Sequence, residues 1–121
     1  MNYYELKRLK TNIDAQKLRV AAARAQAVSL SASIDGTPPP DGGTVYDRVG
    51  MSVGHIIIEE EKLNALYERF TKSIKAIPDE YIKTLIHCKL VKRWSWTRIA
   101  AELGGGNTGD GVRKAVVRYS W

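Results

Sequence analysis

The most constraining feature of the sequence is residues 94–121, where a run of three glycines separates two short amphipathic segments. Ser95 can cap the first helix, whose inward positions are Trp96, Ile99, Ala100 and Leu103. Gly104 is expected to end that helix in the left-handed conformation. Thr108 can cap the second helix, whose inward positions are Val112, Val116 and Tyr119. A helix, a tight turn and a second, basic helix in this order predict a helix-turn-helix.

The second helix of such a motif enters the DNA major groove, where its outward side chains contact the bases. Arg113 and Lys114 face outward and can donate to guanine O6 and N7 or to phosphates. Asn107 and Thr108 can bond a phosphate near the helix end. Asp110 can serve the helix dipole or accept from cytosine N4, but it lowers the affinity for phosphate. The predicted DNA-binding residues are Arg98, Asn107, Thr108, Arg113, Lys114, Val117 and Arg118.

The N-terminal half predicts two long helices. Residues 3–31 lack proline and glycine and place mostly apolar or small residues, and one glutamine, at heptad positions, which are Leu6, Ile13, Val20 and Ala27, with Leu9, Gln16, Ala23 and Leu30. Residues 32–50 contain three prolines and four glycines and predict a loop or linker. A second helix is expected from Val49 or Ser52 to Ile77, with Ile56, Leu63, Phe70 and Ile77 along one stripe.

These elements predict an all-α chain. A third helix over about Pro78–Lys92 buries one face, which consists of Tyr81, Ile82, Leu85, Ile86 and Leu90. The expected architecture is a long, coiled-coil-like helical hairpin over residues 1–77, followed by a three-helix helix-turn-helix domain over residues 78–121. The hairpin is expected to form a homodimer or to contact RNA polymerase, because its apolar stripes exceed what a small third lobe covers.

Charge favours a polyanionic partner such as double-stranded DNA. The net charge is +6, and residues 89–121 hold seven Lys or Arg against two acidic residues. The longest apolar runs are too short for a membrane helix, and residues 1–5 do not resemble a secretion signal. A lone cysteine, Cys88, suits a reducing compartment. The expected location is therefore the bacterial cytoplasm, without membrane contact.

Other classes of function find less support in the residues. Gly104–Gly109 matches the G-x-G-x-x-G pattern, but a helix precedes it where nucleotide binding requires a strand. His55 and His87 lack metal-ligand spacing, so no metal, cofactor or catalytic residue is predicted. Trp94 and Trp96 are more typical of a core than of a base-stacking platform. The alternative to DNA binding is a protein-binding module that inhibits or redirects a host protein through its basic surface.

Trp94-Ser95-Trp96-Thr97-Arg98-Ile99-Ala100-Ala101-Glu102-Leu103 resembles the helix-turn-helix signature of sigma-factor region 4-like domains. The whole chain resembles phage and prophage late transcription regulators of the RinA/ArpU type, through Tyr3 to Leu6, the box Asp47-Arg48-Val49-Gly50, and the acidic segment from Ile56 to Glu61. This resemblance implies a phage-encoded DNA-binding regulator in which Ser95, Trp96, Ile99 and Ala100 are structural positions. Gly104–Gly111 departs from the short turn and polar helix start of that family.

Overall fold

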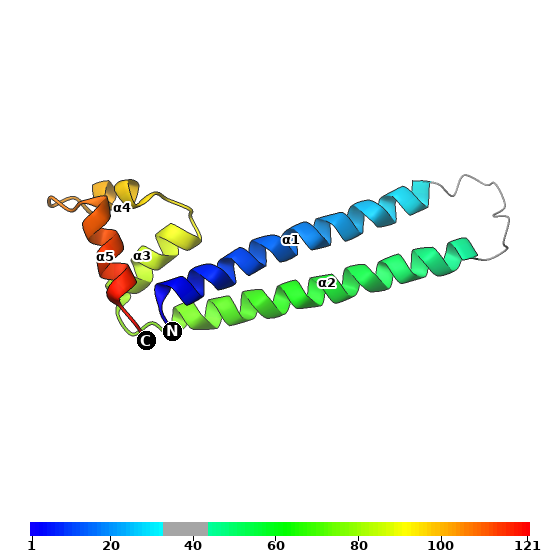
Figure 1. Cartoon of the computed structure of the whole chain (residues 1–121), viewed down its shortest axis with the longest axis horizontal. Coiled ribbons are helices and arrows are strands. Elements are labelled where there is room, and N and C mark those ends of the chain that lie inside the picture. Colours follow the sequence, from blue (N-terminus) through cyan, green and yellow to red (C-terminus); the bar gives the residue numbers. More distant parts are fainter. Residues whose placement is uncertain (33–43) are drawn as a thin grey trace. The chain divides into compact units, whose positions relative to one another are not determined.

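The computed structural model describes residues 1–32 and 44–121, and side chains for residues 1–28 and 53–121. The described residues form five helices, which are α1 (Tyr3–Ala32), α2 (Thr44–Lys75), α3 (Glu80–Leu90), α4 (Trp96–Leu103) and α5 (Gly109–Arg118) (Figure 1). They contain no strand, and one isolated bridge pairs Asn2 with Ser120. The prediction of an all-helical chain with a long N-terminal helix is confirmed.

The bounds of the two long helices differ from the prediction mainly at the start of α2. α2 begins at Thr44, so the predicted start at Val49 or Ser52, and a linker continuing to residue 50, are wrong. The segment 44–52 has one helix-weakening residue, Gly50, whose cost of about 1 kcal/mol is small for a long helix. The Pro38–Pro40 part of the predicted linker lies outside the described residues, as do the side chains of the box 47–50 and of Leu30.

Contacts divide the chain into two compact units, each considered by itself. One unit is Ile13–Leu66, which holds parts of α1 and α2. The other combines Met1–Asn12 with Tyr67–Trp121, so it holds the start of α1, the end of α2 and all of α3, α4 and α5. None of the described helices has a stretch long and apolar enough to cross a lipid bilayer.

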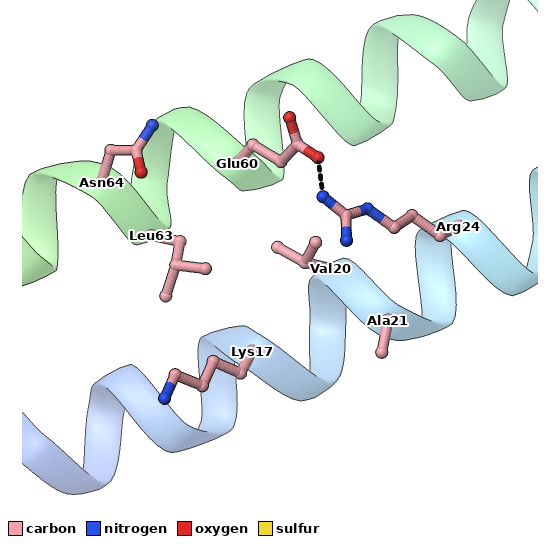
Figure 2. Close-up of a pocket in the computed structure, with 7 residues that line it drawn as sticks. All are labelled: Lys17, Val20, Ala21, Arg24, Glu60, Leu63 and Asn64. Carbon is pink, nitrogen blue, oxygen red and sulfur yellow. Dashed lines mark hydrogen bonds and ion pairs between the residues drawn. The ribbon is translucent and has the colours of Figure 1, made fainter.

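In the unit Ile13–Leu66, α1 and α2 pack along the predicted heptad positions. The buried α1 residues of this unit are Ile13, Gln16, Val20 and Ala23. On one flank, the Arg24 guanidinium pairs with the Glu60 carboxylate of α2, close to Val20 and Leu63 (Figure 2). These side chains line a cavity of about 430 Å³. The ion pair is partly exposed, so it adds little stability beyond the apolar contacts beside it.

A buried polar pair interrupts the apolar seam of this unit. Gln16 is 2% exposed and Glu59 is 7% exposed. The Gln16 Nε2 donates to the Glu59 backbone oxygen at 2.9 Å and to its Oε2 at 2.5 Å. The hydrogen bond from Gln16, assisted by Lys62 at 3.5 Å, lowers the pKa of Glu59 although burial opposes this. The pair satisfies the polar groups that a helix seam would otherwise leave unmatched.

Glu59→Gln should make the protein less sensitive to acid. Because the folded pKa of Glu59 lies below its ordinary value of about 4.3, ionised Glu59 stabilises the fold above that pH, and this contribution is lost as the pH falls through the folded pKa. We therefore expect the difference in the free energy of unfolding between the wild type and Glu59→Gln to be smaller at about pH 3 than at about pH 7. Urea unfolding followed by circular dichroism measures it. The exposed Glu61→Gln is the control, and a pH-independent difference would contradict the assignment.

The second unit has a continuous apolar core. Its buried residues include Leu6 of α1 and Phe70 of α2, together with residues of the three short helices, which are Ile82, Leu85, Ile86, Leu90, Ile99, Ala100, Val112 and Val116. Two predicted core positions are wrong. Tyr81 is 49% exposed and Leu103 is 41% exposed, because both lie at the margin of their helix's buried face. The remaining predicted positions of α3 are buried.

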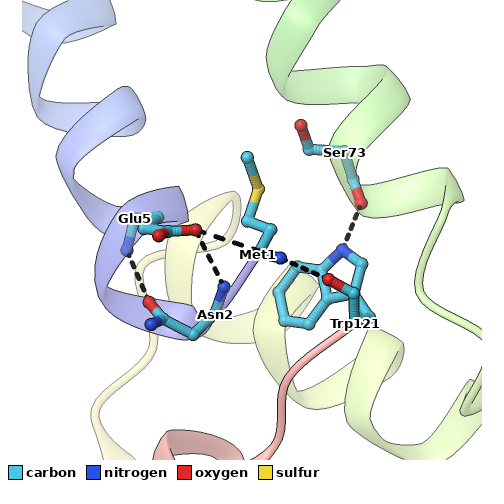
Figure 3. A network of polar contacts seen from close by, with 5 residues as sticks. All are labelled: Met1, Asn2, Glu5, Ser73 and Trp121. Atoms are coloured by element: carbon cyan, nitrogen blue, oxygen red, sulfur yellow. Dashed lines mark hydrogen bonds and ion pairs between the residues drawn. The ribbon is translucent and has the colours of Figure 1, made fainter.

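Hydrogen bonds close this unit where α1 begins (Figure 3). Asn2 and Glu5 form a capping box, in which Glu5 N donates to Asn2 Oδ1 at 3.0 Å and Asn2 N donates to Glu5 Oε2 at 3.2 Å. The Met1 ammonium donates to the Trp121 oxygen, and Trp121 N donates back to Met1 O at 2.8 Å. The Trp121 Nε1 donates to Ser73 O of α2 at 3.2 Å. The segment after α5 is thereby tied to both long helices.

Candidate functional site

The turn between α4 and α5 is built from caps and glycines. Ser95 Oγ accepts from Arg98 N at 3.1 Å, and Thr108 Oγ1 accepts from Gly111 N at 3.1 Å, so both predicted N-caps are confirmed. Gly104, Gly105 and Gly106 have φ values of 69°, 66° and 76°. The ψ of Gly104 is −159°, so the left-handed conformation predicted for it is wrong. This backbone region is essentially restricted to glycine, which explains the glycine there.

A close backbone contact joins the first turns of α4 and α5. A Cβ at Gly109 would lie 3.0 Å from Thr97 N and 3.1 Å from the Trp96 carbonyl carbon. Only glycine fits there without a shift of the α4 backbone. Ala100, predicted as an inward position, is buried, whereas the role of Gly109 was not predicted. A glycine directly after the Thr108 cap, where most residues are tolerated, was the available signal.

Two of the basic side chains of α5 are paired with an acid of the same helix. Arg113 Nη2 lies 3.0 Å from Asp110 Oδ1, and Lys114 Nζ lies 2.9 Å from Asp110 Oδ2. The hydrogen bonds from Lys114 and then Arg113 lower the pKa of Asp110, so this carboxylate stays ionised at neutral pH. Val112 and Val116 are buried, which leaves the three charged residues on the outer side of α5. Asp110 was predicted to serve the helix dipole or to accept from cytosine N4, but its i, i+3 and i+4 spacing to Arg113 and Lys114 also predicts these pairs.

A second group of cations lies beside Trp94 and Trp96, the tryptophans just before and at the start of α4. The Arg98 guanidinium carbon lies 4.2 Å from the Trp94 ring centre, and Lys92 Nζ lies 5.2 Å from it. Lys89 Nζ lies 5.2 Å from the Trp96 ring centre. Both indoles are half-buried. Arg98 is one of the predicted site residues, whereas Lys89 and Lys92 are not, because their proximity to the tryptophans depends on the α3–α4 connection.

The connection itself contains a strained residue. Arg93 has a φ of 58°, a backbone conformation that residues other than glycine and asparagine adopt only rarely. Trp94 N donates to Cys88 O at 3.0 Å, which anchors the chain just after Arg93. The turn at Arg93 therefore directs Trp94 back toward the end of α3.

The other predicted site residues have mixed roles. The Asn107 Nδ2 donates to Gly104 O at 2.7 Å, so this amide holds the glycine turn together. Thr108 is the cap of α5 and is exposed. Arg118 is exposed near the end of α5, and Val117 is half-buried beside it. The structure thus places Arg113, Lys114 and Arg118 on one helix, and Arg98 on the neighbouring one.

In the described part of the chain, no group of three or more His, Cys, Asp or Glu side chains is arranged to hold a metal ion. No known protein family, curated protein or solved structure matches the chain. The resemblance to RinA/ArpU-type regulators therefore stays a prediction.

Proposed function

We propose that the chain is a sequence-specific double-stranded DNA-binding transcription regulator, in which α3–α5 form a helix-turn-helix and α5 docks in the major groove. The observation that carries the proposal is the backbone contact of Gly109 with α4, which sets two capped helices against each other. With Val112 and Val116 buried, the face that carries Arg113, Lys114 and Arg118 is the face available to DNA. Arg113 and Lys114 would donate to guanine or to phosphates.

The tryptophan-bound cations supply a second contact. In docked helix-turn-helix domains the first helix of the motif crosses the phosphate backbone while the second reads bases. Arg98 lies in the first turn of α4 and Lys92 in the connection before it, and both approach the Trp94 ring, so both are candidates for such phosphate contacts. Stacking on Trp94 orders the guanidinium plane and leaves its N–H edge available to a phosphate. Contacts of this kind orient the protein on DNA without reading sequence.

A salt titration of DNA binding tests the proposal. Fluorescence anisotropy of a labelled duplex from a phage late promoter should report binding at about 50 mM salt. The log of the affinity should then fall against log salt with a slope of roughly −3 to −5, because each neutralised phosphate contributes about −0.9. An unrelated duplex should bind more weakly but with a similar slope. Undetectable binding, or binding indifferent to salt, would contradict DNA binding.

The alternative is a protein-binding module that inhibits or redirects a host protein such as RNA polymerase. The observation that favours it is that Arg113 and Lys114 are held by Asp110 and that Asn107 holds the turn, so three predicted DNA contacts have internal partners. A salt-insensitive pull-down of one host protein, with no retention of duplex DNA, would favour this alternative over the first.

The long helices fit a role in assembly. On the unit Ile13–Leu66, several large apolar side chains are exposed, namely Leu18, Val28, Val53, Ile57 and Ile58. We propose that this unit contributes to a homodimer, with RNA polymerase as a further partner, in the bacterial cytoplasm. The division of labour between residues 1–77 and 78–121 is part of the same proposal. Sedimentation velocity measures whether the protein is a dimer. A monomer at a protein concentration of roughly tens of micromolar would contradict the proposed homodimer.

A further inference from the structure

A groove in the second unit lies apart from the proposed DNA contacts. It has a volume of about 370 Å³ and is lined by residues of α1, α2 and α3 and by Val91 just after α3, but by none of α4 or α5. We name it the α2–α3 groove. Its volume falls in the range of about 300–1,000 Å³ that is typical of binding pockets.

The apolar lining of the α2–α3 groove runs along α2. Tyr67, Phe70 and Ile74 line it at i, i+3 and i+7, so the apolar strip covers about 10 Å of helix. Phe70 is buried and Ile74 is half-buried, whereas Val91 on the opposite side is 45% exposed. An elongated apolar strip between helices suits bulky side chains that a second helix presents at the same spacing.

The polar lining of the groove is basic. Lys10 and Lys75 are its two charged side chains, His87 lies with them, and no carboxylate lines it. The Lys10 ammonium lies 6.0 Å from the centre of the Phe70 ring, so positive charge stands directly beside the apolar lining. Carboxylates that flank an apolar side chain would complement this arrangement.

We infer that the α2–α3 groove docks an acidic amphipathic helix of a partner protein. The apolar face of that helix covers Phe70, Ile74 and Val91, and its carboxylates meet the exposed Lys75. A helix is favoured over a small amphiphile because the apolar strip extends over two turns of α2. A site for a small amphiphile would instead enclose the end of its hydrocarbon chain. The inference uses none of the residues of the proposed DNA interface, so DNA binding and helix docking succeed or fail separately.

The test uses a synthetic helical peptide of about 14 residues, with Leu at i, i+3 and i+7 and Glu on both sides. Isothermal titration into the full chain without DNA should give a micromolar Kd. Lys75→Glu should weaken binding about tenfold, because a rim charge is reversed. Thr71→Trp, which changes an exposed residue of the lining, should fill the groove and weaken binding as much. The matched control Lys72→Glu, on the same helix but outside the lining, should change the Kd by less than about twofold.

Circular dichroism confirms that each variant is folded, and two probes decide the chemistry. A peptide with Gln in place of every Glu should bind at least about fivefold more weakly, and decanoate should bind more weakly than the acidic peptide. Absence of peptide binding, equal binding of the Gln peptide, or no effect of Thr71→Trp would overturn the inference. Tighter binding of decanoate at the same residues would overturn it in favour of a small-amphiphile site.

Discussion

Replacing Arg113 and Lys114 together with alanine is expected to weaken duplex DNA binding by about 100-fold at low salt, because each lost contact from a cation costs about 1–3 kcal/mol. Lys114 is exposed and Arg113 is half-buried at the flank of α5, and neither belongs to the buried face formed by Val112 and Val116, so their removal leaves that face in place. Anisotropy of a labelled duplex measures the loss, and circular dichroism should show unchanged helix content.

The companion change Asp110→Asn should act in the opposite direction. Asp110 holds Arg113 at 3.0 Å and Lys114 at 2.9 Å, and its own negative charge would face the phosphates. Its lowered pKa keeps that charge at every pH at which binding is measured. Neutralising it should tighten binding roughly fivefold, the effect of one unit charge at about 4 Å in water. Weaker binding by Asp110→Asn would instead show that Asp110 itself contacts DNA, for example at cytosine N4.

A matched control separates position from charge. Lys62 and Lys72 of α2 are exposed, and each is paired with a carboxylate of its own helix, as Arg113 and Lys114 are. Replacing both with alanine removes the same two charges from a different surface. If this control weakened DNA binding as much as the α5 pair, the affinity would reflect net charge alone, and α5 would not be the groove-docking helix.

Gly109→Ala is expected to destabilise the unit that contains α3, α4 and α5 by about 1–3 kcal/mol, the usual cost of overpacking a close contact. The new Cβ would meet Thr97 N at 3.0 Å and Trp96 C at 3.1 Å, and both are backbone atoms that cannot rotate away. Alanine also has the higher helix propensity, worth up to about 1 kcal/mol, but this gain is smaller than the cost of the contact.

Tryptophan fluorescence during urea unfolding measures this effect selectively. Trp94, Trp96 and Trp121 all lie in the unit concerned. Gly54→Ala is the control, since a Cβ at this α2 position meets nothing within 4 Å, so it should stabilise α2 by up to about 1 kcal/mol. Unchanged stability of Gly109→Ala would mean that α4 and α5 do not approach as closely as described. If Gly109→Ala bound DNA as tightly as the wild type, the contact between Gly109 and α4 would not be needed for DNA binding.

Much of the candidate site could be predicted from neighbouring residues. Ser95 and Thr108 cap α4 and α5 as expected, because a cap bonds an amide only three residues further along. The pairs of Asp110 with Arg113 and Lys114 follow from helical spacing in the same way, although their importance was not recognised. The start of α2 at Thr44 was missed because the run of prolines and glycines masked a helix-compatible segment behind it.

The helical character of the described chain, and the places where most of its helices begin and end, follow from local signals that act within a few residues. Which helix faces meet depends instead on the tertiary structure. It exposed Tyr81 and Leu103, set Gly109 against the backbone of α4, and gathered Lys92 and Arg98 around Trp94. Such contacts depend on the packing of whole helices and on the turn between them, which periodicity alone does not specify.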